Sequence, residues 1–165
     1  MQLTKHTDYA FRTLIFLAAN PDRLCNIQEV AKAFTLSKSH LMKIVNQMVH
    51  AGWVESLRGK NGGIRLAQQP QDINVADVVS QMEQTLAPVN CEDPPCVISP
   101  QCVLKSVLWQ AQREFMQHLR QYTLADVITD PTVQILQIEP LNESQEDDKT
   151  QASEKAQKAD MVEGN

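Results

Sequence analysis

Three cysteines, Cys91, Cys96 and Cys102, lie within one proline-rich segment of the sequence, NCEDPPCVISPQC. Thiolates at this spacing can converge on one soft metal centre, and they leave one ligand position to be filled from elsewhere. A structural zinc site usually shows close C-x₂-C pairs, whereas the gaps here are four and five residues. No fourth cysteine or histidine lies nearby. The pattern therefore favours an iron–sulfur cluster wrapped by a loop over a zinc site.

The three cysteines also have other interpretations. Two of them could form a disulfide, or all three could serve a zinc-dependent or redox-thiol DNA-binding protein without iron. A cluster assembly factor with a vestigial DNA-binding module is a further class. Nothing in the sequence pairs a nucleophile with a base, so we do not expect an enzyme. Residues 14–19, LIFLAA, are too short for a membrane span, which favours a cytoplasmic protein without a membrane partner.

The third cysteine is expected at the start of a long helix. Ser99 suits the N-cap and Pro100 the first helical position, which places Cys102 in the first turn, where the helix dipole favours a thiolate. The helix is expected to reach Tyr122. Its apolar stripe consists of Leu104, Val107, Leu108, Ala111, Phe115, Leu119 and Tyr122. So long a stripe in a small chain predicts packing against a second copy, with intrachain packing as the alternative.

The sequence changes its sign of charge near the middle. Residues 1–70 carry nine Lys/Arg and four Asp/Glu, a balance of +5, whereas residues 71–165 carry six and sixteen, a balance of −10. A basic module on an acidic chain predicts nucleic acid as the partner of that module. We therefore divide the chain into a DNA-binding module (1–70), a cluster-binding and dimerisation region (71–138) and an acidic tail (139–165) that we expect to be disordered.

The DNA-binding module is expected to be mainly helical. Apolar spacing and capping signals predict three helices, over residues 8–20, 26–34 and 37–51, and two more further on, over 74–85 and 124–129. Asn26 and Glu29 form a capping box at the start of the second helix. The short link Thr35–Leu36 between the second and third helices is typical of a helix-turn-helix.

In a helix-turn-helix the third helix buries one side and presents the other to the major groove of DNA. Polar donors on the outward side can meet phosphates and base edges. The residues predicted to do so here are Lys38, Ser39, His40, Lys43 and Gln47. An ordinary solvated helix surface is the alternative interpretation.

A β-hairpin is expected directly after the third helix. Residues 53–57 and 64–67 have the composition of short strands, and Asn61–Gly62 between them is a strong turn signal. Glycines beside Arg58 and Lys60 let the backbone approach a phosphate and let a basic side chain enter a narrow minor groove. The loop therefore predicts the wing of a winged helix-turn-helix, with Arg58, Lys60 and Asn61 as DNA contacts.

Together these features resemble the bacterial iron–sulfur winged-helix transcription regulators. The resemblance rests on the starting segments MQLT and TDYA, the wing RGKNGGIRL, the three-cysteine loop and the segment YTLAD. It covers roughly residues 1–138 and leaves the acidic tail outside. Within this family the chain is most similar to the nitric-oxide-sensing repressors.

The resemblance implies a homodimer that binds a palindromic operator and represses genes for nitric oxide detoxification. It implies one 4Fe–4S cluster per subunit, held by Cys91, Cys96 and Cys102, with Asp8 of the other subunit as the fourth ligand. Nitrosylation of the cluster would release the DNA. The coupling expected from this arrangement is allosteric, because the cluster and the DNA occupy separate sites.

Other ligands and cluster forms stay open. From the sequence alone Asp8 is the N-cap or first-turn acid of the first helix, and Glu92 and Asp93 are alternative ligands within the loop. A sister branch of the family has a histidine three residues after its third cysteine and binds a 2Fe–2S cluster. Lys105 occupies that position here, which disfavours a 2Fe–2S sensor of cluster supply. Cys25 lies outside the pattern and is expected to be a structural or incidental thiol.

Overall fold

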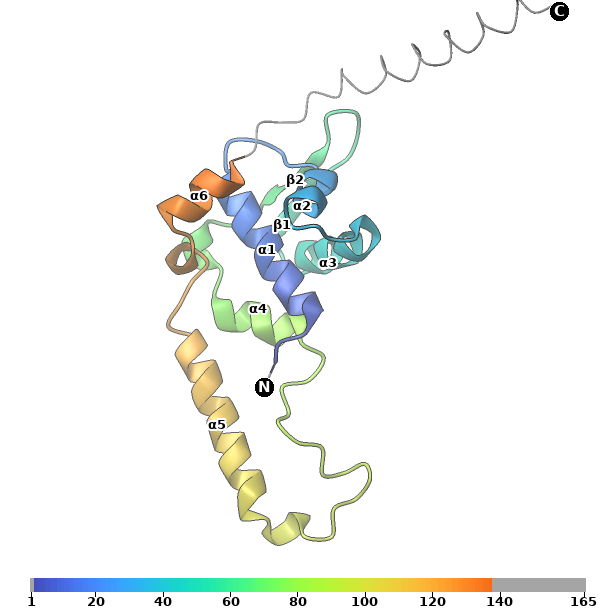
Figure 1. The fold of residues 1–165 in the computed structure, drawn as a ribbon, viewed down its shortest axis with the longest axis vertical. Coiled ribbons are helices and arrows are strands. Elements are labelled where there is room, and N and C mark those ends of the chain that lie inside the picture. The colour runs from blue at the N-terminus through green and yellow to red at the C-terminus, as the bar shows by residue number, and fades with distance from the viewer. Residues whose placement is uncertain (1, 138–165) are drawn as a thin grey trace, which may run out of the picture.

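The computed structural model describes residues 2–137, which form a helical body and a long helical arm (Figure 1). The helices are α1 (Lys5–Ala19), α2 (Ile27–Ala33), α3 (Lys38–His50), α4 (Val75–Met82), α5 (Val103–Leu119) and α6 (Asp130–Leu136). The antiparallel strands β1 (Val54–Leu57) and β2 (Gly63–Leu66) form a hairpin. Short 3₁₀ turns cover η1 (Pro70–Asp72), η2 (Ser99–Gln101) and η3 (Ala125–Val127). The predicted acidic tail lies outside the described residues, and no helix within them is long and apolar enough to cross a membrane.

Helix α1 is the centre of the body and contacts α3, α4, α6 and the hairpin. Its side chains Leu14 and Phe16 are completely buried, as are Leu41 and Ile44 on the inner face of α3. The predicted apolar face of the third helix is therefore confirmed. The N-cap of α1 is Thr4, whose hydroxyl accepts the Thr7 amide, so the helix begins earlier than the sequence suggested.

The link between α2 and α3 makes a tight turn. Asn26 and Glu29 form the predicted capping box at the start of α2. After this helix Thr35 adopts a left-handed conformation with φ of 54°, which is uncommon for a β-branched residue. The Leu36 amide then donates to the Ala31 carbonyl at 2.8 Å. This turn sets α3 across the end of α2 and confirms the helix-turn-helix.

The hairpin has a five-residue loop, because Leu57 pairs with Gly63. Its turn is closed by the Gly62 amide, which donates to the Gly59 carbonyl at 3.0 Å. Gly59, with φ of 114°, supplies the left-handed residue. The turn signal Asn61–Gly62 therefore lies at the end of a longer loop and does not form a two-residue hairpin.

Cys25 extends this hairpin by one residue on its open edge. Its amide and carbonyl exchange hydrogen bonds of 2.9 Å with Ile64 of β2. A Cβ at Gly63 would lie 2.8 Å from the Cys25 carbonyl oxygen, so only glycine permits this approach. The Cys25 side chain is fully buried, and burial, opposed by nearby Arg23, raises the pKa of its thiol to about 11. These observations agree with a structural thiol.

The C-terminal helices differ from the predicted ones at several points. Helix α4 ends at Met82, short of the predicted residue 85. Residues 99–101 form a separate 3₁₀ turn, and α5 begins only at Val103 because Cys102 has an extended backbone, with ψ of 105°. Cys102 is thus the N-cap of α5 and not a first-turn residue. Helix α5 ends at Leu119, short of Tyr122. The predicted helix at 124–129 is a single 3₁₀ turn, followed by the unpredicted α6, which packs against α1.

Candidate nucleic-acid interface and cysteine loop

The outward side of α3 carries four of its five predicted DNA contacts in exposed positions: Lys38, Ser39, His40 and Lys43. Lys38 Nζ donates to Gln28 Oε1 of α2 at 3.0 Å, and the Ser39 hydroxyl lies 2.9 Å from that of Ser37. These bonds are on the surface and can be exchanged for bonds to phosphate. The His40 ring packs edge-on against Tyr9 of α1 at 5.6 Å between centroids, which orients it.

Gln47, the fifth predicted contact on α3, is placed differently. It is half-buried and both ends of its amide are engaged inside the chain. Its Oε1 lies 2.7 Å from His6 Nε2 of α1, and its Nε2 donates to the Gln81 carbonyl of α4 at 2.8 Å. This arrangement ties the middle of α3 to two other helices.

The wing places its three predicted contacts, Arg58, Lys60 and Asn61, in exposed positions of the loop between β1 and β2. Figure 1 shows this loop projecting from the body on the same side of α1 as α3. Below the loop, Arg65 forms an ion pair with Glu55 on the neighbouring strand, which the sequence analysis did not single out. A recognition helix and a basic wing on one side of the body form a surface suited to a DNA groove and its flanking backbone.

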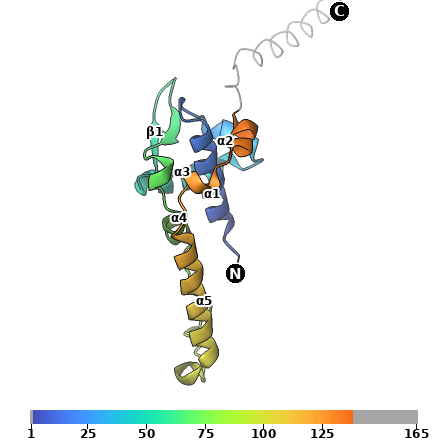
Figure 2. The same cartoon turned by 90° about the vertical axis from the view of Figure 1, so that its left-hand side faces the viewer.

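The three cysteines of the loop lie on the arm, well away from the predicted DNA-binding surface (Figure 1). Figure 1 shows the chain leaving α4, running to the far end of the arm and returning through α5, and Figure 2 shows α5 extending away from the body. The loop is held by its own turns: the Cys96 amide donates to the Cys91 carbonyl at 3.1 Å, and the Ser99 amide to the Cys96 carbonyl at 3.0 Å. At the start of α5 the Lys105 amide donates to Cys102 Sγ at 3.4 Å.

The chemistry of these donors fits an iron–sulfur cluster. All three are free thiols, Cys96 is exposed, and Cys91 and Cys102 are half-buried. Within residues 2–137 the single chain does not gather three Cys, His, Asp or Glu side chains into one ligand group. Gathering the thiols would therefore accompany cluster loading, as is usual where metal binding and local folding are coupled.

Asp8, the predicted fourth ligand, belongs to the body. Both of its oxygens contact Arg12 one turn later, each at 2.9 Å, in a pair that is about 40% exposed. With α1 in the body and the cysteines on the arm, one chain does not bring them together (Figure 1). Since Thr4 is the N-cap, Asp8 acts in the free chain as a first-turn acid and an ion-pair partner.

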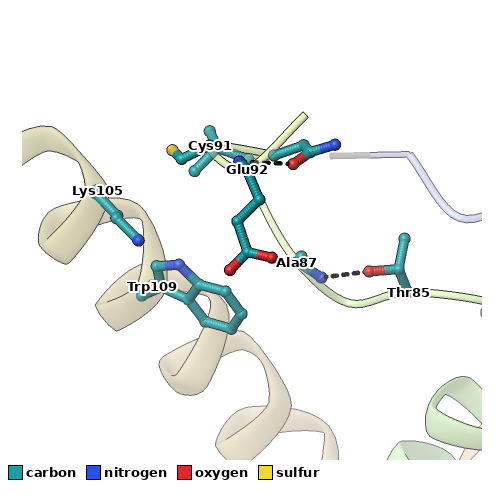
Figure 3. A pocket seen from close by; sticks show the side chains of 8 residues that line it. Thr85, Ala87, Cys91, Glu92, Lys105 and Trp109 are labelled. Carbon is teal, nitrogen blue, oxygen red and sulfur yellow. Dashed lines mark hydrogen bonds between the residues drawn. The ribbon is translucent and has the colours of Figure 1, made fainter. Parts of the chain in front are cut away.

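A pocket of about 360 Å³ lies between the cysteine loop and α5 (Figure 3). Cys91, Glu92, Lys105 and Trp109 contribute to its lining. The Glu92 carboxylate points toward the Trp109 indole and away from the Cys91 sulfur, so these two groups do not converge. Trp109 was not among the residues predicted for this site, although it lies seven residues, or two helical turns, after Cys102.

Comparison with known proteins identifies the family. Residues 3–130 match the Rrf2 family, described as iron-dependent transcriptional regulators. The chain belongs to the Rrf2 family. This Rrf2 protein is a winged-helix transcriptional regulator and not an enzyme, and the resemblance found in its sequence is confirmed.

Individual relatives agree with this assignment. The HTH-type transcriptional regulator NsrR of Bacillus subtilis (strain 168) is 46% identical over 132 residues, which cover 78% of this chain and 90% of that protein. The B. subtilis global cysteine regulator CymR has a similar structure, with a TM-score of 0.63 and 25% identity over 76% of this chain and 95% of that one. T. potens IscR gives a TM-score of 0.62 and 25% identity over 76% and 85%.

Proposed function

We propose that this Rrf2 protein is a homodimeric repressor that senses nitric oxide through an iron–sulfur cluster. Cys91, Cys96 and Cys102 would hold the cluster, in a 4Fe–4S form, and its reaction would release a palindromic operator. The observation that carries the proposal is the combination of three free, accessible thiols on an arm with a winged helix on the body. The similarity to a regulator named NsrR supports the same conclusion.

The exposed apolar surface of α5 supports a dimer. Val103, Leu104 and Val107 are 75%, 63% and 54% exposed, and Met116 is the only buried residue of the helix. Helix α5 packs on α4 through Phe115, Met116 and Leu119 in its second half, whereas the three exposed apolar residues belong to its first half. Burying such a stripe against a second α5 would remove it from water, which is the usual reason for pairing of amphipathic helices.

A dimer would also supply the fourth ligand. Since Asp8 and the cysteines are far apart in one chain, a carboxylate for the cluster is expected from the partner subunit. Three soft thiolates and one harder carboxylate leave one iron more weakly held, and when bound this cluster would supply the iron with which nitric oxide reacts. Asp8 would exchange its Arg12 contact for the cluster and so connect the partner's α1 to this arm.

On DNA, the body would use α3 and the wing. Lys43 and the first-turn side chains of α3 face outward for the major groove, and Arg58 and Lys60 for the flanking backbone or minor groove. Two such bodies in a two-fold dimer would read two half-sites of opposite orientation, which is why the operator should be palindromic.

The proposal is tested by anaerobic purification followed by iron and sulfide analysis, with absorption spectra before and after addition of nitric oxide. The expected result is a brown protein with about four irons per subunit, whose visible absorption is replaced by that of nitrosylated iron. Binding to a duplex selected from a random-sequence library should then weaken on exposure to nitric oxide. A colourless protein that contains zinc, or DNA binding indifferent to nitric oxide, would contradict the proposal.

A further inference from the structure

One group of hydrogen bonds joins three helices of the body at a single place, which we call the junction. It connects the first turn of α1, the middle of α3 and the end of α4. Its members are Thr4, His6, Thr7, Gln47, Gln81 and Glu83. Apart from Gln47, none of these residues was predicted from the sequence to belong to a site, because they lie up to 79 positions apart.

Glu83 is the acceptor at the centre of the junction. Its Oε1 accepts the Thr4 amide at 2.8 Å, the Thr4 hydroxyl at 3.1 Å and the Thr7 hydroxyl at 2.5 Å. Burial alone would raise the pKa of Glu83, but the bonds from Thr7 and Thr4 and the nearby His6 lower it on balance. The carboxylate is therefore charged and firmly held. Thr7 is completely buried, so losing Glu83 would leave its hydroxyl without this bond in a buried position.

Gln47 forms the second half of the junction. Its Oε1 can only accept, so His6 donates through Nε2–H, while the Gln47 amide nitrogen donates to the Gln81 carbonyl. Reversing the amide would place the Gln47 side-chain oxygen against the Gln81 carbonyl oxygen, so that two acceptors would face each other. The side chain thus has one orientation, and it holds α3 against α1 and α4 together.

The junction lies between the two functional regions of the chain. Glu83 is the C-cap of α4 and the residue from which the cysteine loop departs. Thr4 and Thr7 belong to the turn of α1 that leads into Asp8, and Gln47 is on the helix that carries the predicted DNA contacts. Any change in the path of the loop at residue 84 acts first on Glu83.

We propose that Glu83 and Gln47 are positioning residues that transmit the state of the cysteine loop to the recognition helix. The inference rests on the proposed function, and it assigns Gln47 to helix placement in place of DNA contact. A shift at the root of the loop would move the Glu83 carboxylate and the Gln81 carbonyl together, because both belong to the end of α4. Helix α1 would follow through Thr7, and α3 through Gln47. Two sites become coupled in this way when one element has two arrangements that both sites bias.

The test compares operator affinity in two states of the same protein. The probe is a palindromic duplex selected by the parent protein from a random-sequence library, measured at fixed salt with cluster-loaded and cluster-free protein. The variants are Gln47→Ala and Glu83→Ala. Gln81→Ala is the matched control, because Gln81 contributes only its backbone carbonyl. Thr7→Val, which keeps the side-chain shape and removes one hydroxyl, serves as the milder variant if Glu83→Ala does not fold.

We expect the parent and Gln81→Ala to bind at least about fivefold more tightly with the cluster than without it. In Gln47→Ala and Glu83→Ala, or in Thr7→Val, this ratio should fall toward one while the iron content stays that of the parent. Equal weakening in both states, which keeps the ratio, would identify Gln47 as a direct DNA contact and overturn the inference. Parent ratios in all variants would also overturn it. A parent ratio of one would instead contradict the proposed function itself, and the inference with it.

Discussion

The body and the arm of this protein are stabilised in opposite ways. The body has a continuous core around α1, in which Leu14, Phe16 and Leu41 are completely buried, and both α1 and α2 begin with side-chain caps. The arm buries only Met116 of α5, and its cysteine loop is held by short turns. The body thus contains what it needs to keep its shape. The arm instead offers thiols and apolar surface, which is what a region suited to respond to a bound group and a second subunit would present.

The difference is sharpest for the four cysteines. Cys25 in the body is buried and its pKa is raised to about 11, whereas each arm cysteine is at least partly exposed. A thiol with that pKa is thiolate to only about one part in a thousand at pH 8. Cysteine therefore serves as an unreactive core residue in the body and as an accessible potential ligand in the arm.

The largest effect is expected from Cys96→Ala. Removing this exposed thiol should abolish stable cluster binding and leave the helical circular dichroism signal nearly unchanged, because the side chain supports no core. Iron and sulfide analysis of anaerobically purified protein measures the loss. The control Cys25→Ala should keep its iron and lose about 1 kcal/mol of stability to unfolding. A full complement of iron in Cys96→Ala would refute the cluster assignment.

The next largest effect concerns the apolar surface of the arm. Val107→Glu should weaken self-association by about 2 kcal/mol or more, since a carboxylate would be buried without a partner between two copies of α5. Sedimentation at several concentrations measures it. Arg113→Glu, an exposed position about 120° around α5 from Val107, is the matched control and should remain dimeric. A dimer that tolerates Val107→Glu would mean that another surface joins the subunits.

A smaller effect is expected on the DNA-binding side of the body. Arg58→Ala and Lys43→Ala should each weaken operator binding about tenfold without altering the cluster spectrum, because both side chains are exposed and distant from the arm. If each contacts a phosphate, the slope of log affinity against log salt should fall by about one. Unchanged affinity in both variants would show that DNA contacts a different face.

The smallest change in stability is expected from Asp8→Ala. The residue contributes an exposed i,i+4 pair with Arg12 and not the N-cap, so its loss should cost only about 0.5 kcal/mol in unfolding. If it is the partner's ligand, cluster-loaded protein should also show an altered spectrum and weaker operator binding at equal iron content. A parent-like spectrum and affinity would leave Asp8 with its role in α1 alone.

The body could be predicted from its sequence because its signals are local. The capping box at Asn26 and the buried face of α3 depend on residues three or four positions apart, and the wing follows from glycines and basic residues in one short segment. Even there, the Asn61–Gly62 signal misplaced the turn, since Gly59 supplies the left-handed residue.

The remaining features depended on contacts between distant residues or on an unusual local cap. Helix α5 begins later than predicted because Cys102 is its N-cap and accepts a hydrogen bond through its sulfur, a role seldom assigned to cysteine. Helix α6 is held by its packing on α1, where the Asn20 amide donates to the Leu136 carbonyl at 3.0 Å. The polar residue Gln47 was predicted to face DNA, and only the fold reveals its partners on α1 and α4.

Because Gln47 is engaged inside the chain, it limits the length of DNA sequence that α3 can contact. The exposed predicted contacts on α3 then span Lys38 to Lys43, a rise of roughly 7.5 Å, a little more than the length of two base pairs. A sequence of two or three base pairs recurs by chance throughout a genome, so one recognition helix alone cannot specify a binding site. In the proposed function, a specific site would require that short sequence to be repeated symmetrically at fixed spacing, with further discrimination from the groove shape at the wing.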